Sequence, residues 1–176
     1  MAVWGIAGTP LKKLGTGKTL SAIYLALLFH KKAGLHIVSN IHIYGVPYTL
    51  MTHPRQLIGL KNSVVIIDDI YRFMGGRDSS VRKLCNIIAG ESRKSRLEVI
   101  YISSVLTDMV KRTLRRHTDY YIIPEFNKKT RVLKLNVVNQ LGGPERILPS
   151  HLPGQITTQL FKYYNTREPV PIITDF

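Results

Sequence analysis

A glycine-rich segment near the amino terminus carries the residue types that bind the phosphates of a nucleotide. The segment runs Gly15-Thr16-Gly17-Lys18-Thr19-Leu20 and separates an apolar stretch, residues 3–7, from a stretch rich in alanine and leucine, residues 20–32. Backbone N–H groups of such a loop, with the start of the following helix, can surround a triphosphate, and glycine lets the backbone approach it closely. We therefore predict that Gly15 to Leu20 bind ATP, with Lys18 at the β- and γ-phosphates and the Thr19 hydroxyl on Mg²⁺.

The loop departs from the usual spacing of this motif. The pattern G-x-x-x-x-G-K-[ST] places a glycine at position 12, where this sequence has Lys12. Removing residues 11–14, LKKL, leaves GTPGTGKT, which fits the pattern, so we interpret LKKL as an insertion. Within it, Lys13 is either a second lysine on the phosphates or part of a solvated basic bulge.

Two consecutive carboxylates follow a short, wholly apolar run. Residues 64–67 are VVII, and Asp68 and Asp69 come directly after them. Such a run is typical of a strand buried on both faces, and a carboxylate at its end can orient Mg²⁺ beside a phosphate-binding loop. We assign that role to Asp68 and predict that Asp69 activates the attacking water, where glutamate is commoner. The alternative is that Asp69 only caps the loop.

Serine and arginine side chains supply further candidates. Residues 97–102 form another apolar run, which ends in Ser103 and Ser104. If this strand lies between the other two, Ser104 can sense the γ-phosphate; the alternative is a turn starter. Oligomeric ATPases often borrow an arginine from the neighbouring subunit to stabilise charge in the transition state. Our candidates for this arginine finger are Arg77, Arg93 and Arg96.

The charge balance predicts a polyanionic partner. The chain has 25 Lys and Arg against 11 Asp and Glu, a formal charge of +14, and its pI is about 10.1. With 44% hydrophobic and 20% charged residues, it is too apolar for a disordered basic tail. The run KRTLRRH places basic side chains around a short helix, so we predict a DNA-binding surface there, against the alternative of a solvated face. Its members are Lys111, Arg112, Arg115 and Arg116.

Strand-like and helix-like segments alternate through the first 125 residues, which predicts an α/β fold with a mainly parallel sheet. A β-hairpin with its turn at residues 127–130 is expected to join the sheet edge. The 176 residues are expected to form one domain, with a nucleotide-binding core at 1–125 and a hairpin, loop and tail at 126–176. The expected strands span residues 3–7, 36–43, 64–67, 97–102, 119–123 and 131–138; the expected helical segments span 20–32, 54–60, 79–92 (capped by Asp78 or Ser79), 107–117 and a final element at 155–164.

Other functions are disfavoured by what the sequence lacks. Cys85 is the single cysteine, so no internal disulfide can form, and the histidines include no H-x-x-x-H pair for a metal. The longest apolar stretch, residues 20–29, is shorter than the roughly 18 residues of a membrane span. We expect a protein without a membrane span, in a reducing compartment such as the cytoplasm.

The order of these motifs resembles the Zot-like branch of the FtsK/HerA superfamily, which includes filamentous-phage assembly ATPases and viral genome-packaging ATPases. The resemblance rests on GTGKT, LHIVSNIHI, VVIIDD, ESRKSRLEVIYISS, LRRHTDYYIIP and FKYYNTREPV, in this order. It implies a RecA-like P-loop NTPase sandwich of three layers, and a homo-oligomeric, hexameric ring that hydrolyses ATP to move double-stranded DNA. Lys18, Thr19, Asp68 and Asp69 match its nucleotide-site positions.

Two departures from the family pattern refine the expectation. The family often has glutamate at position 69 and glutamine near position 104, where this chain has Asp69 and Ser104. The phage assembly proteins usually carry a membrane span and an outer domain after the ATPase, and we expect neither in this protein. We therefore expect a motor that packages viral DNA into a capsid in the host cytoplasm, with capsid or portal proteins as partners. The alternatives are a phage assembly or export ATPase, a small-molecule or nucleotide kinase, and a nucleic-acid-binding protein without hydrolysis. A GTP switch ranks lowest, because Asn127-Lys128-Lys129-Thr130 lacks the aspartate of N-K-x-D.

Overall fold

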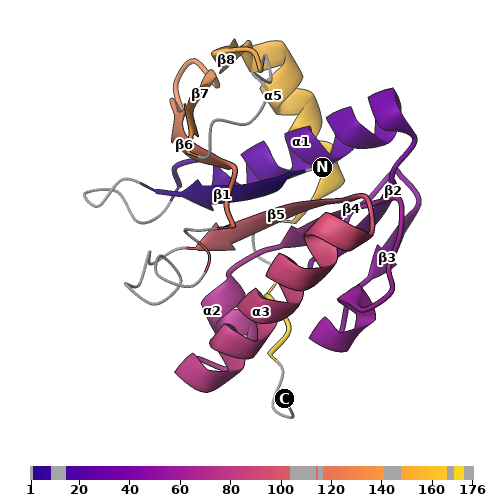
Figure 1. Cartoon of the computed structure of the whole chain (residues 1–176). Helices are drawn as coiled ribbons and strands as arrows, with labels where there is room; N and C mark the ends of the chain where they lie inside the picture. Colours follow the sequence, from indigo (N-terminus) through magenta and orange to yellow (C-terminus); the bar gives the residue numbers. More distant parts are fainter. Residues whose placement is uncertain are drawn as a thin grey trace.

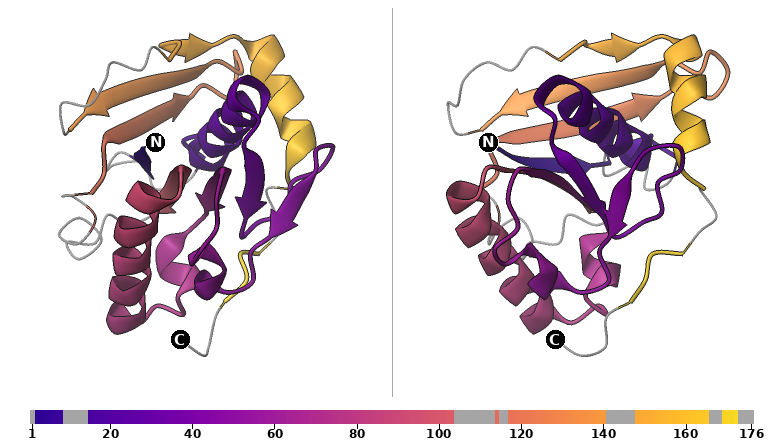
Figure 2. Two further views of the ribbon diagram at one scale, coloured as in Figure 1. Left: turned by 45° about the vertical axis from the view of Figure 1, so that its right-hand side comes forward. Right: turned by 90° about the vertical axis from the view of Figure 1, so that its right-hand side faces the viewer.

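The fold is a mixed β-sheet covered by helices on both faces (Figures 1 and 2). The computed structural model describes residues 2–8, 15–103, 114, 117–140, 148–165 and 169–172. Within these ranges the sheet has eight strands in the order β3-β2-β4-β5-β1-β6-β7-β8. The strands are β1 (Val3–Ala7), β2 (His36–Ser39), β3 (Tyr48–Leu50), β4 (Ser63–Ile67), β5 (Leu97–Ser103), β6 (Tyr120–Phe126), β7 (Leu133–Asn139) and β8 (His151–Leu152).

The first six strands in this order, from β3 through β2, β4, β5 and β1 to β6, pair in parallel. Strands β7 and β8 then extend the sheet with antiparallel pairing. Strand β5 lies between β1 and β4: Val99 is opposite Val3 on one side and Val65 on the other. The mainly parallel α/β sheet that the sequence predicts is therefore confirmed. The carboxyl ends of β1, β4 and β5 share one edge of the sheet, where the candidate residues follow them.

Helices α1 (Lys18–Ala33) and α5 (Gly154–Leu160) cover one face of the sheet, and α2 (Ile70–Phe73) and α3 (Asp78–Lys94) cover the other (Figures 1 and 2). Two 3₁₀ helices, η1 (Pro54–Leu57) and η2 (Phe161–Tyr163), complete the described elements. Helix α1 ends as the sequence predicts, at Gly34 with a φ of 66°, whose N–H donates to the His30 carbonyl at 3.0 Å. None of the helices in the described ranges has the length and apolarity that a bilayer crossing requires.

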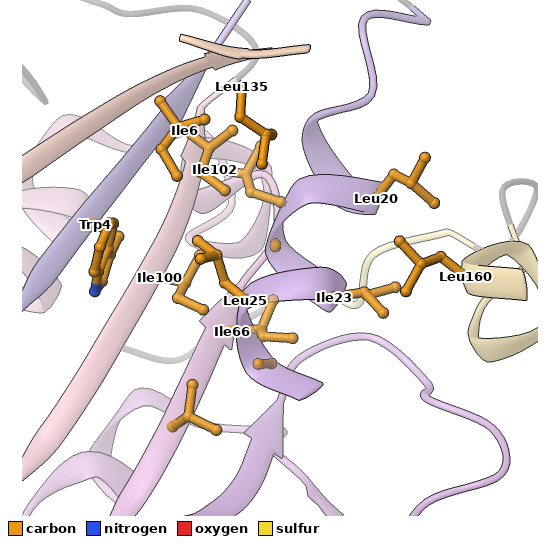
Figure 3. Packing of buried hydrophobic residues seen from close by; sticks show 14 of the residues in the cluster. Trp4, Ile6, Leu20, Ile23, Leu25, Ile66, Ile100, Ile102, Leu135 and Leu160 are labelled. Carbon is orange, nitrogen blue, oxygen red and sulfur yellow. The ribbon is translucent and has the colours of Figure 1, made fainter. Parts of the chain in front are cut away.

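Successive residues of each strand point to opposite faces of the sheet and contribute to two apolar layers, one on each face. Leu25 of α1 packs toward the strand residues Ile66 and Ile100, and Ile23 points toward Leu160 (Figure 3). Trp4 belongs to this layer; its ring stacks on Tyr120 with centroids 4.3 Å apart, and its indole N–H donates to Glu98 at 2.9 Å. The layer under α3 contains residues of opposite strand parity, including Val3, Val65 and Ile67.

Several boundaries differ from the sequence expectation. Strand β2 ends at Ser39 rather than at residue 43; the next residue, Asn40, still donates its backbone N–H to the Ile66 carbonyl at 3.2 Å, and its side chain binds the backbone of Asp68. Strand β3 and helix α2 are additional to the expected elements. The N-cap of α3 is Arg77, without a side-chain cap bond, so the expectation of Asp78 or Ser79 as the cap is wrong. Most of the helix expected at residues 107–117 lies outside the described residues.

The hairpin expected near residue 127 is confirmed. Strands β6 and β7 pair antiparallel along their whole length, from Tyr120 opposite Asn139 to Phe126 opposite Leu133. The Asn127 carboxamide oxygen accepts hydrogen bonds from the N–H groups of Lys129 at 2.9 Å and Thr130 at 3.2 Å, which closes the turn. The final expected element corresponds to α5 and η2.

Candidate functional site

The glycine-rich loop leads into the first turn of α1 after β1. Gly15 and Gly17 have φ angles of 71° and 87°, in the left-handed region that favours glycine. A Cβ on Gly17 would lie 2.6 Å from Leu133 Cδ1, so no side chain fits there. None of the described side chains caps the N-terminus of α1, so its first N–H groups face the loop without such a partner. The inserted residues 11–14, with Lys12 and Lys13, lie outside the described residues.

A direct hydrogen bond joins the first turn of α1 to the end of β4. The Thr19 hydroxyl donates to Asp68 Oδ2 at 2.8 Å. Burial raises the pKa of the Asp68 carboxyl, and the bond from Thr19 opposes that shift. Burial lowers the pKa of Lys18, and the charges of Asp68 and Asp69 oppose this shift in turn. Lys18 and both carboxylates therefore share one electrostatic environment at the carboxyl edge of the sheet.

Asn40 holds the backbone at Asp68 with both ends of its carboxamide. Its Nδ2 donates to the Asp68 carbonyl at 2.8 Å, and its Oδ1 accepts from the Asp68 N–H at 2.7 Å. The residue is fully buried. The sequence analysis assigned it no role, although a polar residue directly after the apolar strand β2, at the carboxyl edge of a parallel sheet, is a usable signal.

Asp69 turns the chain out of the sheet immediately after Asp68. Its φ of 42° and ψ of 63° are left-handed, a conformation that costs a non-glycine residue about 1–2 kcal/mol and that aspartate tolerates better than most. Its side chain is the N-cap of α2 and accepts from the Arg72 N–H at 3.5 Å. The capping role left open by the sequence is therefore present, and the carboxylate still lies beside Asp68 and is partly exposed.

The remaining candidates separate into three groups. Strand β5 lies between β1 and β4, which is the arrangement that a γ-phosphate sensor at the end of β5 requires. Ser103, at this end, is buried. Ser104 itself and the basic residues Lys111, Arg112, Arg115 and Arg116 lie outside the described residues. Arg77 directly precedes α3 and is exposed.

Arg93 and Arg96 lie at the opposite edge of the sheet from the carboxylates. Arg96 directly precedes β5, and Arg93 lines a pocket of about 240 Å³ with Ala2 and Val3 at the start of β1. The seven residues of β5 span about 20 Å at roughly 3.3 Å per residue. Neither arginine can therefore contact a nucleotide held by its own subunit at Thr19 and Asp68, and each could act only on a neighbouring copy.

The segment after η2 also reaches this site. Burial and the negative charge of Asp68 raise the pKa of Tyr164 to about 12. The Tyr164 ring stacks on Phe161 with centroids 6.0 Å apart, and the Tyr163 carbonyl accepts from the Tyr44 N–H at 2.8 Å. Sequence reasoning assigned these aromatic residues no site role, and only tertiary packing brings them to the carboxylates.

Comparison with known proteins adds one finding on the fold. No protein-family model and no curated protein matches the sequence. The structure is similar to the crystal structure of the N-terminal domain of zonular occludens toxin from Neisseria meningitidis, with a TM-score of 0.54 and 15% identity, over 93% of this chain and 98% of that domain. The chain therefore shares the fold of that domain. This agrees in fold with the Zot-like resemblance of the sequence motifs; the wider FtsK/HerA and packaging assignments stay predictions.

Proposed function

We propose that the protein is a P-loop ATPase whose site lies between the loop at Gly15–Thr19 and the carboxylates Asp68 and Asp69. The observation that carries this proposal is the 2.8 Å hydrogen bond from Thr19 to Asp68. It brings a hydroxyl from the loop and a carboxylate from β4 to one point, with β5 between the two strands that present them. The Zot-like fold supports the same assignment.

The loop residues would hold the phosphates. The N–H groups of Gly15 to Leu20 and the positive end of α1 attract negative charge, and the ammonium group of Lys18 adds a point charge beside them. The left-handed φ of Gly15 and Gly17 supports a cradle in which a Cβ would intrude. The half-buried Lys18 remains next to two carboxylates that favour its charged form.

Thr19 and Asp68 fit a magnesium site completed by the substrate. Both supply the oxygen atoms that Mg²⁺ prefers, and among the described residues no group of three or more His, Cys, Asp or Glu could hold a metal by itself. Mg²⁺ bound there would neutralise charge on the phosphate oxygens. Asn40 keeps the Asp68 backbone, and therefore its carboxylate, in place.

Asp69 is proposed to accept the proton of the attacking water. The water oxygen forms a bond to the γ-phosphorus, the bond between this phosphorus and the bridging oxygen of ADP breaks, and the proton passes to the Asp69 carboxylate. Its αL backbone turns the side chain out of the sheet beside the buried Asp68. Aspartate is one methylene shorter than glutamate, so we expect slow ATP hydrolysis in the absence of the DNA partner.

We further infer that hydrolysis drives movement of double-stranded DNA, as in packaging of a viral genome by a hexameric ring. The formal charge of +14 supports an anionic partner. In such a ring Arg93 or Arg96 would act on the nucleotide of the neighbouring subunit, because both are distant from their own. The whole chain is proposed to act as one domain, since β7, β8 and α5 pack into the same apolar layer as β1 and α1.

The test is the rate of ATP hydrolysis by purified protein with and without duplex DNA. We expect DNA to stimulate turnover, Lys18→Ala to abolish it, and Asp69→Asn to bind ATP without hydrolysing it. Lys61→Ala removes the same charge from an exposed position at the other edge of the sheet and should retain full activity. Turnover that survives in Asp69→Asn would remove that residue as the base.

Other outcomes select other functions. ATP consumption that DNA does not change, but that depends on a small acceptor molecule, would favour a kinase. Nucleotide binding with no turnover under any condition would favour a nucleic-acid-binding protein without hydrolysis, with the inserted LKKL as the first segment to delete. Failure to bind ATP at all would refute the proposal.

A further inference from the structure

A second pocket opens beside the glycine-rich loop, on the side of the β6–β7 hairpin. Its volume is about 760 Å³, within the range of about 300–1,000 Å³ that small-molecule sites occupy. Gly15 and Thr16 form one wall, and the hairpin forms the rest. We call it the hairpin pocket; its lining comprises Gly15, Thr16, Pro124, Glu125, Phe126, Asn127, Lys128, Lys129, Thr130, Val132 and Lys134.

The lining of the hairpin pocket combines an apolar surface with positive charge. Phe126 and Val132, from the two arms of the hairpin, provide aromatic and aliphatic surface. The Phe126 ring is held on its other side by an edge contact with Phe161, with centroids 5.7 Å apart. Lys128 reaches the loop itself: its Nζ lies 3.5 Å from the position that a Cβ on Gly15 would occupy.

Thr16 gives an independent indication of a ligand. Thr16 is one of the residues that line the hairpin pocket, and it is only 6% exposed. Among the described residues its hydroxyl has no hydrogen-bond partner. A buried hydroxyl without a partner is destabilising, and it is uncommon in folded proteins unless a ligand or water completes it. A polar ligand atom at the junction of loop and pocket would satisfy it.

We propose that the hairpin pocket binds the base and ribose of the nucleotide whose phosphates lie on the Gly15–Thr19 loop. The base packs against Phe126 and Val132, the Thr16 hydroxyl bonds to the ligand at the junction, and the Lys128 ammonium contacts the phosphate chain above Gly15. This inference rests on the proposed ATPase function and adds the element that recognises the nucleoside. The hairpin, which the sequence analysis treated as an addition at the sheet edge, is then part of the substrate site.

The inference predicts different affinities for two ligands that the loop alone would bind with similar affinity. Inorganic tripolyphosphate offers the phosphate chain without base or ribose. The test is isothermal titration of the whole protein with each ligand in the presence of Mg²⁺. We expect ATP to bind about tenfold or more tightly than tripolyphosphate, because stacking of a base on an aromatic side chain is worth about 1–3 kcal/mol.

Two variants locate the difference. Phe126→Leu keeps an apolar side chain against Gly17 and Phe161 but removes the ring; we expect it to weaken ATP binding about fivefold or more and leave tripolyphosphate binding unchanged. Lys128→Ala should weaken both ligands, since Lys128 is exposed and its proposed contact is with phosphate. Lys61→Ala, with the same loss of charge at the far edge of the sheet, should weaken neither.

The outcomes distinguish the pocket from the loop. Equal affinity for ATP and tripolyphosphate, or an undiminished preference for ATP in Phe126→Leu, would overturn the hairpin pocket and leave the proposed ATPase standing. Absence of binding by both ligands would overturn both. Photolabelling of the unmodified protein with 8-azido-ATP needs no variant: label within residues 124–134 supports the inference, and label confined to other peptides refutes it.

Discussion

Asn40 offers a direct test of how the carboxylate at the end of β4 is held. Its carboxamide donates to the Asp68 carbonyl and accepts from the Asp68 N–H, at 2.8 Å and 2.7 Å, and the side chain is fully buried. The substitution Asn40→Leu retains the branched shape of the side chain and removes both partners. The Asp68 N–H and carbonyl, which are partly buried, then lose the side-chain partner that both share in the described structure.

The expected loss follows from these two groups. A buried backbone group that loses its partner costs about 1–3 kcal/mol, so the loss of two partners in Asn40→Leu should lower the free energy of unfolding by about 2–6 kcal/mol. A domain in the middle of the ordinary stability range of about 5–15 kcal/mol remains folded after such a loss. Because Asp68 is no longer fixed, Mg²⁺-dependent ATP turnover should fall further than ATP affinity does.

Urea unfolding measured by tryptophan fluorescence suits this question, because Trp4 is the single tryptophan and is buried against Tyr120. Asn86→Leu, at an exposed position of α3, is the matched control and should change stability by less than about 0.5 kcal/mol. In Asn40→Asp the loss in free energy of unfolding should become smaller as the pH falls, because a protonated carboxyl again carries a donor for the Asp68 carbonyl. A loss below about 0.5 kcal/mol in Asn40→Leu would refute the reasoning.

Three further predictions follow from positions described above. Gly17→Ala should destabilise the protein by more than Gly34→Ala: both residues have left-handed φ angles, but a Cβ meets Leu133 at 2.6 Å only at Gly17, and urea unfolding of both variants isolates the clash. In the nucleotide-free protein burial raises the pKa of Asp68, so its contribution to stability falls as the pH rises from the unfolded value through the folded one. Asp68→Asn should therefore raise the melting temperature more at neutral pH than at a pH near the ordinary carboxyl pKa, and an equal shift at both would contradict the raised pKa. Burial raises the pKa of the Cys85 thiol to about 12, so a thiol reagent at pH 8 should react only as fast as the protein unfolds; rapid labelling of the folded protein would show that the α3 layer opens locally.

The central strands and the first helix are predictable because local signals agree with their tertiary environment. Strand β1 has the predicted bounds, and β4 and β5 each differ from the prediction by a single residue, since all three are short apolar runs buried on both faces. The candidate pair Thr19 and Asp68 follows from the same pattern: residues that end parallel strands or begin the next helix gather at one edge. Their hydrogen bond is the geometry that this rule implies.

The parts that sequence reasoning missed depend on distant partners. The position of Asn40 directly after β2 marks it as a candidate, but its sequence context does not indicate that its carboxamide binds the Asp68 backbone. Strand β3 has three residues after a proline and is defined by its pairing with β2, so its sequence carries little periodic signal. Helix α2 is a single turn that begins at the Asp69 cap. The hairpin pocket arises only when the turn at residues 127–130 folds back over Gly15.

The shared apolar layer has a consequence for how the protein is made. Leu133 abuts Gly17, and Leu160 packs beside Ile23 on the face of α1 (Figure 3), so residues from the last third of the chain complete the surroundings of a loop near its beginning. During synthesis from the amino terminus, α1 must keep this face uncovered until β7 and α5 have emerged. The nascent chain therefore presents an apolar helix face that a chaperone can bind until the final segments arrive.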